Sequence, residues 1–306
     1  MRANIEMGQI PVLVLAFNRP DHVEKAMKAI RDYKPEKLYL ACDGPRIQKD
    51  GEKKAVEETR KKMLESIDWP CNVKTLFREE NHGCARAVYG AISWFFEQEE
   101  YGIICEDDIV LSPDFFLFCE DLLPRYAKEE KVLQISARNT SRRVDIPNSY
   151  VYAQCFHCWG WATWRRAWDK MDMSMSATNR LSLLYLAKRL GLFRGLMMKR
   201  LFHRGYKHLS SFSSWATRWF LSILDNDGLV ICPGVNMAVN IGMDEGTHFN
   251  AIDAKRPGAS LSLGKMEWPI FHNDSLIVDK KQKQYDSRFF FINRVYGLKK
   301  KLHLKI

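Results

Sequence analysis

Three consecutive carboxylates, Glu106, Asp107 and Asp108, follow a short apolar run at residues 101–105. Such a run is typical of a buried strand, which would deliver the three acids to its carboxyl end. Adjacent carboxylates repel one another, and a divalent cation or hydrogen-bond donors offset that repulsion. Ser112-Pro113 then has the residue types of a helix cap and a first helical position. A solvated acidic turn is the alternative, but the predicted strand and helix on either side favour a cation site.

The elements that must position these acids follow a regular pattern over the first 137 residues. Strands are predicted at 11–17, 37–43, 72–78, 101–105 and 132–136, and helices at 21–33, 50–67, 84–98 and 112–126. The first helix is expected to start from a capping box at Asp21 and Glu24. The alternation predicts an α/β fold with a doubly wound, mostly parallel sheet flanked by helices, whose ligands bind beyond the carboxyl ends of the strands.

The second half has a looser pattern. Strands are predicted at 150–155 and 229–232, and helices at 181–204 and 213–224, so the C-terminal elaboration should be largely helical. Four of the nine tryptophans lie between positions 159 and 168. No internal repeat or low-complexity linker separates the two halves, which indicates one large domain with an extension.

The composition excludes several classes of protein. The chain has 306 residues, of which 46% are hydrophobic and 27% charged, values that exclude disordered and repeat-array proteins. No apolar run reaches the ~18 residues of a membrane-spanning helix, and residues 1–9 lack the pattern of a secretory signal, so we expect a cytoplasmic protein. The eight cysteines are expected to be reduced, and Cys155 and Cys158, with zinc-like spacing but no second pair, to be buried thiols.

The net charge of +10 comes from two segments. Residues 180–208 contain eight Lys or Arg and residues 294–306 contain five, with no Asp or Glu in either, so the rest of the chain is slightly acidic. Both segments combine basic and apolar residues, as in helices that lie on anionic membranes. We therefore expect peripheral association with the inner face of a membrane, or with an anionic acceptor assembled there. A solvated basic face over an ordinary core is the alternative.

The acidic segment resembles a known family. The order of strand, Glu-Asp-Asp, apolar residues and Ser-Pro-Asp-Phe-Phe over residues 101–116 is similar to the DXD-type motif of GT-A fold glycosyltransferases. In particular, it resembles the N-acetylglucosaminyltransferase I family and related bacterial nucleotide-sugar transferases. The resemblance implies a GT-A-like fold, a nucleoside diphosphate sugar donor linked to uridine (UDP), and Mn²⁺ or Mg²⁺ as cofactor. It also implies that Asp108 binds the cation, while Glu106 and Asp107 approach the ribose or donor sugar.

Other segments match that family in the same order along the chain. The loop after the first strand resembles its first nucleotide-binding loop, Asp43 is similar to the carboxylate that meets the uracil ring, and residues 81–86 lie where related enzymes close over the nucleotide. Residues 156–168 resemble the Gly-Trp stretch beside the sugars. Turn residues and core tryptophans are the alternatives. The residues implied are Phe17, Asn18, Arg19, Asp43, Asn81 and Arg86 for the nucleotide, and Gly160, Trp161 and Trp215 for the acceptor or donor sugar.

One departure from the family concerns the general base. Related bacterial sequences have an Asp in a Ser-Trp-Asp-Tyr-Gln-Trp-like element, and this chain has Ala216 at that place. Asp244 and Glu245 are the remaining candidates for the base. His248 and His272 are candidates to approach the metal or diphosphate, with a structural role as the alternative. Ala216 also leaves open a protein that binds the donor without turning it over.

The sequence thus predicts a metal-dependent, inverting glycosyltransferase of surface polysaccharide or glycoconjugate synthesis, with a glycan or lipid-linked acceptor. Its expected domain covers 1–250, with a nucleotide-binding half at about 10–137 and an acceptor half at about 138–250, followed by an extension with a basic tail at 251–306. A sugar nucleotidyltransferase is one alternative, although the first strand leads into Asn18-Arg19-Pro20 and not Gly-x-Gly-Thr-Arg. A polyanion-binding protein is another, but no nucleic-acid motif occurs, so we expect no nucleic acid partner.

Overall fold

The computed structural model describes residues 8–141, 143, 145–146, 149–154, 156–242 and 261–301, with only the backbone described at 298–301. Its centre is an eight-stranded sheet in the order β3-β2-β1-β4-β8-β6-β9-β7, and β5 and β10 form a separate pair. The strands are β1 (Val12–Ala16), β2 (Lys37–Cys42), β3 (Asn72–Phe77), β4 (Tyr101–Glu106), β5 (Ile109–Leu111), β6 (Val132–Ser136), β7 (Tyr150–Ala153), β8 (Trp161–Trp164), β9 (Leu229–Pro233) and β10 (Ala238–Asn240).

Strands β1 to β4 pair in parallel, as do β6 and β9, whereas β8 runs antiparallel between β4 and β6, and β7 is an antiparallel edge strand. β1 and β6 are fully or almost fully buried, because apolar residues face helices on both sides of the sheet. The predicted fold class, a mostly parallel α/β sheet flanked by helices, is confirmed.

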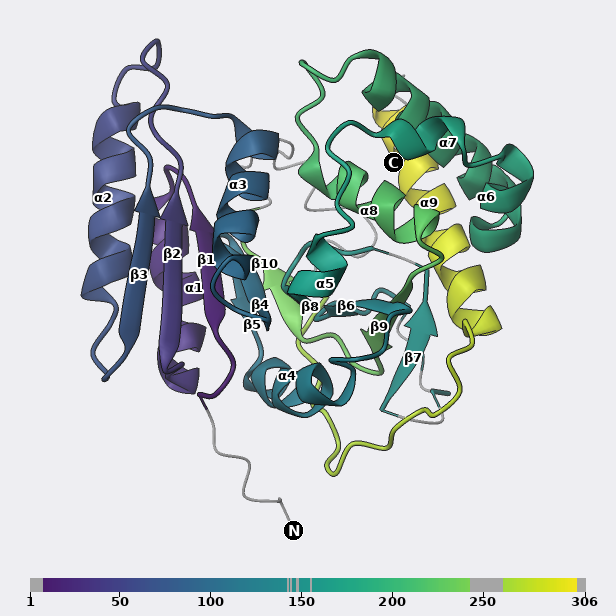
Figure 1. The fold of residues 1–306 in the computed structure, drawn as a ribbon, viewed down its shortest axis with the longest axis horizontal. Coiled ribbons are helices and arrows are strands. Elements are labelled where there is room, and N and C mark those ends of the chain that lie inside the picture. Colours follow the sequence, from purple (N-terminus) through teal and green to yellow (C-terminus); the bar gives the residue numbers. More distant parts are fainter. Residues whose placement is uncertain are drawn as a thin grey trace.

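Helices cover both faces of the sheet. In Figure 1, α1 lies behind the strands and α3 in front of them, while α6, α7 and α9 gather at the side away from α2. Helix α1 contacts α2 and α4, and α3 contacts α5 and α8. The helices are α1 (Pro20–Tyr33), α2 (Glu52–Glu65), α3 (Cys84–Phe96), α4 (Pro113–Arg125), α5 (Arg165–Trp168), α6 (Leu183–Leu190), α7 (Leu192–Lys207), α8 (Trp215–Asp225) and α9 (Lys280–Lys301), and a 3₁₀ turn covers Ser176–Asn179.

Three local features differ from the sequence prediction. The expected helix over 181–204 is wrong, because Gly191 adopts φ +85° and separates α6 from α7. The expected capping box at Asp21 is also wrong. Helix α1 begins one residue earlier, because Pro20 has the φ of a first helical residue, and Asp21 lies in the first turn. The predicted cap at Ser112 is confirmed, since its side chain accepts a hydrogen bond from Asp114 N.

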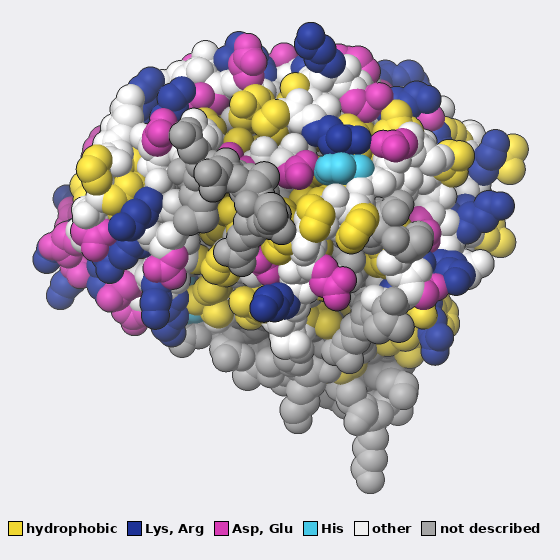
Figure 2. Space-filling view, turned by 90° about the horizontal axis from the view of Figure 1, so that it is seen from below, with side chains coloured by type: hydrophobic (Ala, Val, Ile, Leu, Met, Phe, Trp, Pro, Cys, Tyr) yellow, Lys and Arg dark blue, Asp and Glu magenta, His cyan; other side chains and the backbone are white. Residues whose placement is uncertain are grey.

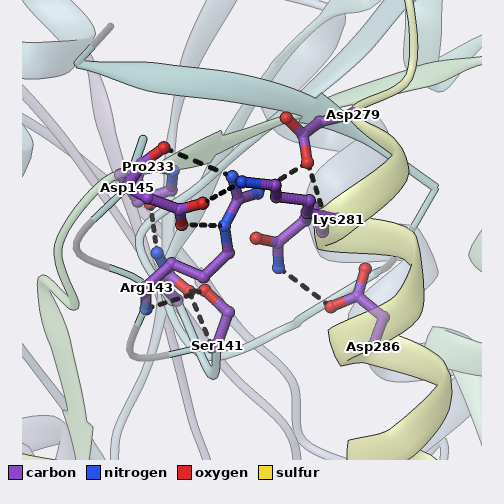
Figure 3. A network of polar contacts seen from close by, with 9 residues as sticks. Ser141, Arg143, Asp145, Pro233, Asp279, Lys281 and Asp286 are labelled. Carbon is purple, nitrogen blue, oxygen red and sulfur yellow. Dashed lines mark hydrogen bonds and ion pairs between the residues drawn. The ribbon is translucent and has the colours of Figure 1, made fainter. Parts of the chain in front are cut away.

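An ion-pair network around the buried Arg143 side chain fixes the start of α9 (Figure 3). Arg143 donates from Nε to Asp145 at 2.8 Å and from Nη1 to Asp279 at 2.6 Å. Asp279 also accepts from the backbone N of Gln282 at 2.6 Å, which caps the helix, and Lys281 pairs with Asp145 at 2.6 Å. The C-terminal helix is therefore held to the segment that follows β6. The division of the chain at residue 250 stays a prediction.

The cysteines of the described residues are all free thiols, and Cys155 lies outside those residues. Within the part of the chain that the structure describes, no helix combines the length and apolar character needed to cross a membrane.

Candidate active site

The three acids lie where β1 and β4 end side by side. The backbone N of Asp107 donates to Leu15 O at 2.9 Å, which continues the pairing of these strands past their last residues. Asp107 and Asp108 are both buried, and Glu106 is the last residue of β4. The carboxyl edge of the sheet therefore gathers the acidic residues together with the loop after β1, as expected for a doubly wound fold.

Arg19 forms ion pairs with two of these acids. It lies between Asp107, at 2.5 Å from Nη2 to Oδ1, and Asp108, at 2.9 Å from Nη1 to Oδ2. The backbone N of Phe17 donates to the second oxygen of Asp107 at 3.2 Å. A single guanidinium thus bridges two adjacent carboxylates, a geometry that suits its fixed fork of donors. The sequence predicted that Arg19 would face a nucleotide, and here it faces the acids.

Asp108 retains one carboxylate oxygen with no partner. Its Oδ1 is buried and accepts no hydrogen bond in the structure, while the backbone N of Ile241 donates to the carbonyl of Asp108 at 2.8 Å. Gly242 passes so close that an added Cβ would lie 2.5 Å from Asp108 Oδ2, which explains a glycine there. A buried, unsatisfied carboxylate oxygen is a suitable ligand for Mg²⁺ or Mn²⁺. No cluster of three or more His, Cys, Asp or Glu among the described residues forms a complete metal site.

Glu106 and Asp107 have raised pKa values. Burial, followed by the charges of Asp108 and Asp107, raises the pKa of Glu106 to about 8, and the hydrogen bond to the Trp215 side chain opposes this shift. Burial raises the pKa of Asp107 to about 6, against the opposing effect of Arg19. Near neutral pH, Glu106 therefore holds a proton and Asp107 is the charged partner of Arg19. The contact with Trp215 also places the first turn of α8, with Ala216, beside the acidic motif.

Asp43 organises the loop before α3. Its carboxylate accepts hydrogen bonds from the backbone N of His82 and of Gly83, each at 3.1 Å, and from Asn81 Nδ2 at 3.1 Å. Asp43 is buried, so in this structure it fixes residues 81–83 at the end of β2. Arg86, one turn into α3, is exposed. Contact of these residues with a nucleotide stays a prediction.

Sequence reasoning missed two residues that frame the loop after β1. Glu52 accepts from Asn18 Nδ2 at 3.0 Å and from the backbone N of Arg46 at 2.8 Å. The Arg46 guanidinium lies 5.5 Å from the centre of the Phe17 ring. These contacts join the loops after β1 and β2. The sequence feature that could have identified Arg46 is its position directly after the Asp43-Gly-Pro turn.

The structure places the predicted sugar-contact residues Gly160, Trp161 and Trp215 in buried positions. Trp161 is fully buried and stacks on Trp215, also buried, with ring centres 5.7 Å apart. Gly160 has φ +70°, and an added Cβ would lie 2.3 Å from Leu111 Cδ2. All three are therefore buried, and their contact with a donor or acceptor sugar stays a prediction. The neighbouring Trp159 is only partly buried, and the Arg138 guanidinium lies 3.6 Å from its ring centre.

The remaining candidates lie elsewhere. Asp244, Glu245 and His248 are outside the described residues. His272 accepts or donates a hydrogen bond at 3.3 Å with Tyr150 of the edge strand β7 and lies 3.5 Å from Asp121 of α4. These contacts give His272 a structural role away from the acids, in place of the expected approach to a metal or diphosphate.

Comparisons with known proteins agree with the predicted resemblance. The model of the GNT-I family matches residues 2–177. Alpha-1,3-mannosyl-glycoprotein 2-beta-N-acetylglucosaminyltransferase of Arabidopsis thaliana is 24% identical over 180 residues, which are 54% of this chain and 40% of that protein. The chain therefore spans less than half the length of this relative.

Two solved structures are similar at a low level. Mouse xyloside xylosyltransferase 1, in its apo form, is 10% identical over 71% of this chain and 81% of its own, with a TM-score of 0.34. HddC from Yersinia pseudotuberculosis is 11% identical over 52% of this chain and 78% of its own, with a TM-score of 0.32. Neither likeness is strong enough to support an argument about function.

Proposed function

The chain belongs to the GNT-I family, and we propose that it is a glycosyltransferase that moves a sugar from a UDP-linked donor to an acceptor hydroxyl. The observation that carries the proposal is the pairing of the two carboxylate oxygens of Asp108. One of its oxygens is paired with Arg19, and the other is buried without a partner at the carboxyl ends of β1 and β4. This arrangement supports a site for a cation together with an anionic ligand.

Asp108 Oδ1 would hold the divalent cation, Mn²⁺ or Mg²⁺. When bound there, the cation would offset the negative charge that develops on the departing diphosphate. Mg²⁺ is commonly held by one or two carboxylates together with substrate phosphates. One free carboxylate oxygen from the chain is therefore consistent with a cation that binds together with the donor.

Arg19 has a second role in the proposal, toward the diphosphate. Its guanidinium presents five donors, and only two of them are used by Asp107 and Asp108. A phosphate oxygen near Asp108 would take a further donor, while the short contact to Asp107 keeps the side chain oriented. Phe17, Asn18, Asp43, Asn81 and Arg86 keep their proposed places around the nucleotide, with Asp43 acting through residues 81–83.

The transfer itself is proposed as a single in-line displacement that inverts the anomeric centre. The acceptor oxygen bonds to the anomeric carbon as the bond from that carbon to the diphosphate oxygen breaks, and a base takes the acceptor proton. Asp244 and Glu245 remain the candidates, because they follow closely after Gly242, whose backbone lies against Asp108. The proposed acceptor is a glycan or lipid-linked sugar of surface polysaccharide or glycoconjugate synthesis, and an anionic membrane is a further proposed partner.

The experiment is a comparison of UDP binding with and without Mn²⁺ in the parent and in Asp108→Asn. The substitution keeps the shape of the side chain and removes the charge that a hard cation requires, so Mn²⁺-dependent UDP affinity should fall at least about tenfold. Asp121→Asn on α4, whose carboxylate faces His272 and not Arg19, is the matched control. Equal affinity in a folded Asp108→Asn protein contradicts the assignment. Slower transfer by Asp244→Ala or Glu245→Ala at saturating donor identifies the base.

A further inference from the structure

Apolar side chains are exposed along the corner where α6 meets α7 and on the adjoining part of α9. We call this the corner surface, and its most exposed members are Leu184, at 81%, and Leu192, at 72%. The rings of Phe193 on α7 and Phe291 on α9 lie 5.1 Å apart, so these two helices share one apolar patch. Its apolar members are Leu184, Leu192, Phe193, Phe291 and Ile292.

The corner is packed firmly on α9. Ser287 Oγ donates to Leu190 O at 2.5 Å, and an added Cβ on Gly191 would lie 3.1 Å from Ser287 Oγ. The left-handed turn at Gly191 thus brings the first residues of α7 against the middle of α9. Because hydrogen bonds hold this junction, the exposed side chains project from a fixed backbone.

Basic residues flank the apolar ones at helical spacing. Lys188 lies four residues after Leu184 on α6, and Arg288 lies three and four residues before Phe291 and Ile292 on α9. The only acid between residues 280 and 297 is Asp286, which is buried and bonded to Gln282. Figure 2 shows basic and hydrophobic side chains next to one another at the edge where α6 and α9 lie, and basic side chains mixed with acidic ones at the edge of α2.

The structure also shows which basic residues of residues 180–208 are free to bind an external partner. Arg180 pairs with Asp225 at 2.6 Å, Arg189 pairs with Asp227, and Lys199 donates to the carbonyls of Thr178 and Leu181. Arg194 is buried against the rings of Phe220 and Phe290. The other basic residues of this segment, Lys188, Arg200, Arg204 and Lys207, are exposed.

We propose that the corner surface docks on an anionic lipid bilayer, with its leucine and phenylalanine side chains among the headgroups and its basic side chains on the lipid phosphates. This combination is the one found in helices that lie on membranes. A second copy of the chain is disfavoured, because a self-complementary contact would bring Lys188 and Arg288 near their own equivalents. An anionic polysaccharide would satisfy the charges but leave the apolar side chains in water. The proposal is independent of the transferase activity.

The test is sedimentation of the full chain with vesicles of phosphatidylcholine alone or with about one third phosphatidylglycerol. Binding is expected only to the anionic vesicles and should be released by salt. Each basic residue near such a surface contributes about 1 kcal/mol, so Lys188→Gln with Arg288→Gln should weaken binding roughly 30-fold. Lys54→Gln with Lys61→Gln, both exposed on α2, is the matched control.

A second pair of variants tests the apolar part. Leu192→Ser should weaken vesicle binding several-fold, whereas Leu64→Ser, 45% exposed on α2, should not. Absence of binding to anionic vesicles overturns the proposal, as do equal losses in the corner and α2 variants. Self-association that depends on Leu192, without vesicle binding, overturns it in favour of a second copy. Thermal unfolding and UDP binding at parental values show that a variant is folded and separate this test from that of the transferase.

Discussion

Replacement of Arg19 by methionine removes the cation that separates Asp107 from Asp108. Their side chains are 3% and 11% exposed, and that of Arg19 is 26% exposed. Loss of one partner of a buried ion pair costs about 3–5 kcal/mol. The partial exposure of Arg19 and proton uptake by Asp107 reduce this loss, so we expect about 2–3 kcal/mol at pH 7.5. For 306 residues, with an unfolding entropy of about 2.1 cal/mol/K per residue, this lowers Tm by about 3–5 °C.

The assay is thermal unfolding of the metal-free protein, followed by titration with Mn²⁺. Arg31→Met is the matched control, because Arg31 pairs with Asp68 at 3.5 Å, and the two side chains are 41% and 61% exposed. Such a pair contributes at most about 1 kcal/mol, or less than about 2 °C. Without Arg19, the carboxylates have no internal cation, so Mn²⁺ alone should raise the Tm of Arg19→Met more than that of the parent.

The expected loss also depends on pH. Asp107 has a pKa of about 6 beside Arg19, and below that pH a protonated Asp107 no longer requires a cation. The difference in Tm between the parent and Arg19→Met should therefore shrink between pH 7.5 and pH 5. Equal losses in Arg19→Met and Arg31→Met, or no greater response to Mn²⁺, would refute the view that Arg19 neutralises the acids.

Three further predictions concern residues around the site and the C-terminal helix. Asp43→Ala should weaken UDP binding without changing its Mn²⁺ dependence, because Asp43 holds residues 81–83 and not the cation; isothermal titration at several Mn²⁺ concentrations checks this. Burial and the nearby charges of Arg138 and Arg194 keep the pKa of His157 well below 6.5. The unfolded state therefore binds a proton that the folded state does not, and the free energy of unfolding falls as the pH drops below about 6.5. Denaturation at pH 7.5 and 5.5 should show that this fall is smaller in His157→Gln than in the parent. Asp279→Asn keeps an acceptor for Gln282 N but loses the charge facing Arg143, so urea unfolding should show a loss of about 1–3 kcal/mol, against less than about 0.5 kcal/mol for the exposed Asp274→Asn.

Hydrophobic periodicity predicted seven of the strands that the structure describes and missed three short ones, β5, β8 and β10. The runs that became β1, β2 and β4 are apolar over five or six residues and end at turn or acidic residues. Trp161–Trp164 became β8 because it fits between β4 and β6, and such long-range pairing has no local sequence signal. The break between α6 and α7 depends on one glycine, which also occurs inside continuous helices.

The site was predictable in its position but not in its contacts. A buried strand ending in three acids fixes where Glu106, Asp107 and Asp108 must lie. Asp107 and Asp108 follow Arg19 by 88 and 89 positions along the chain. Only the pairing of β1 with β4 brings these residues together. Burial of Trp161 likewise follows from its place in β8. The residue type alone does not predict this burial, because tryptophans occur both in cores and at surfaces.

If a cation and a nucleotide bind at the acidic motif as proposed, the charge balance of the motif predicts that they bind together. Burial keeps Glu106 protonated near neutral pH, and Arg19 offsets one of the two charged carboxylates, Asp107 and Asp108. The motif thus carries about one net negative charge and one free oxygen, which is too little to bind a hydrated divalent cation tightly. A diphosphate supplies the missing oxygens and at the same time gives Arg19 an anionic partner. Mn²⁺ or UDP alone should therefore stabilise the protein weakly, and the two together by more than the sum of their separate effects.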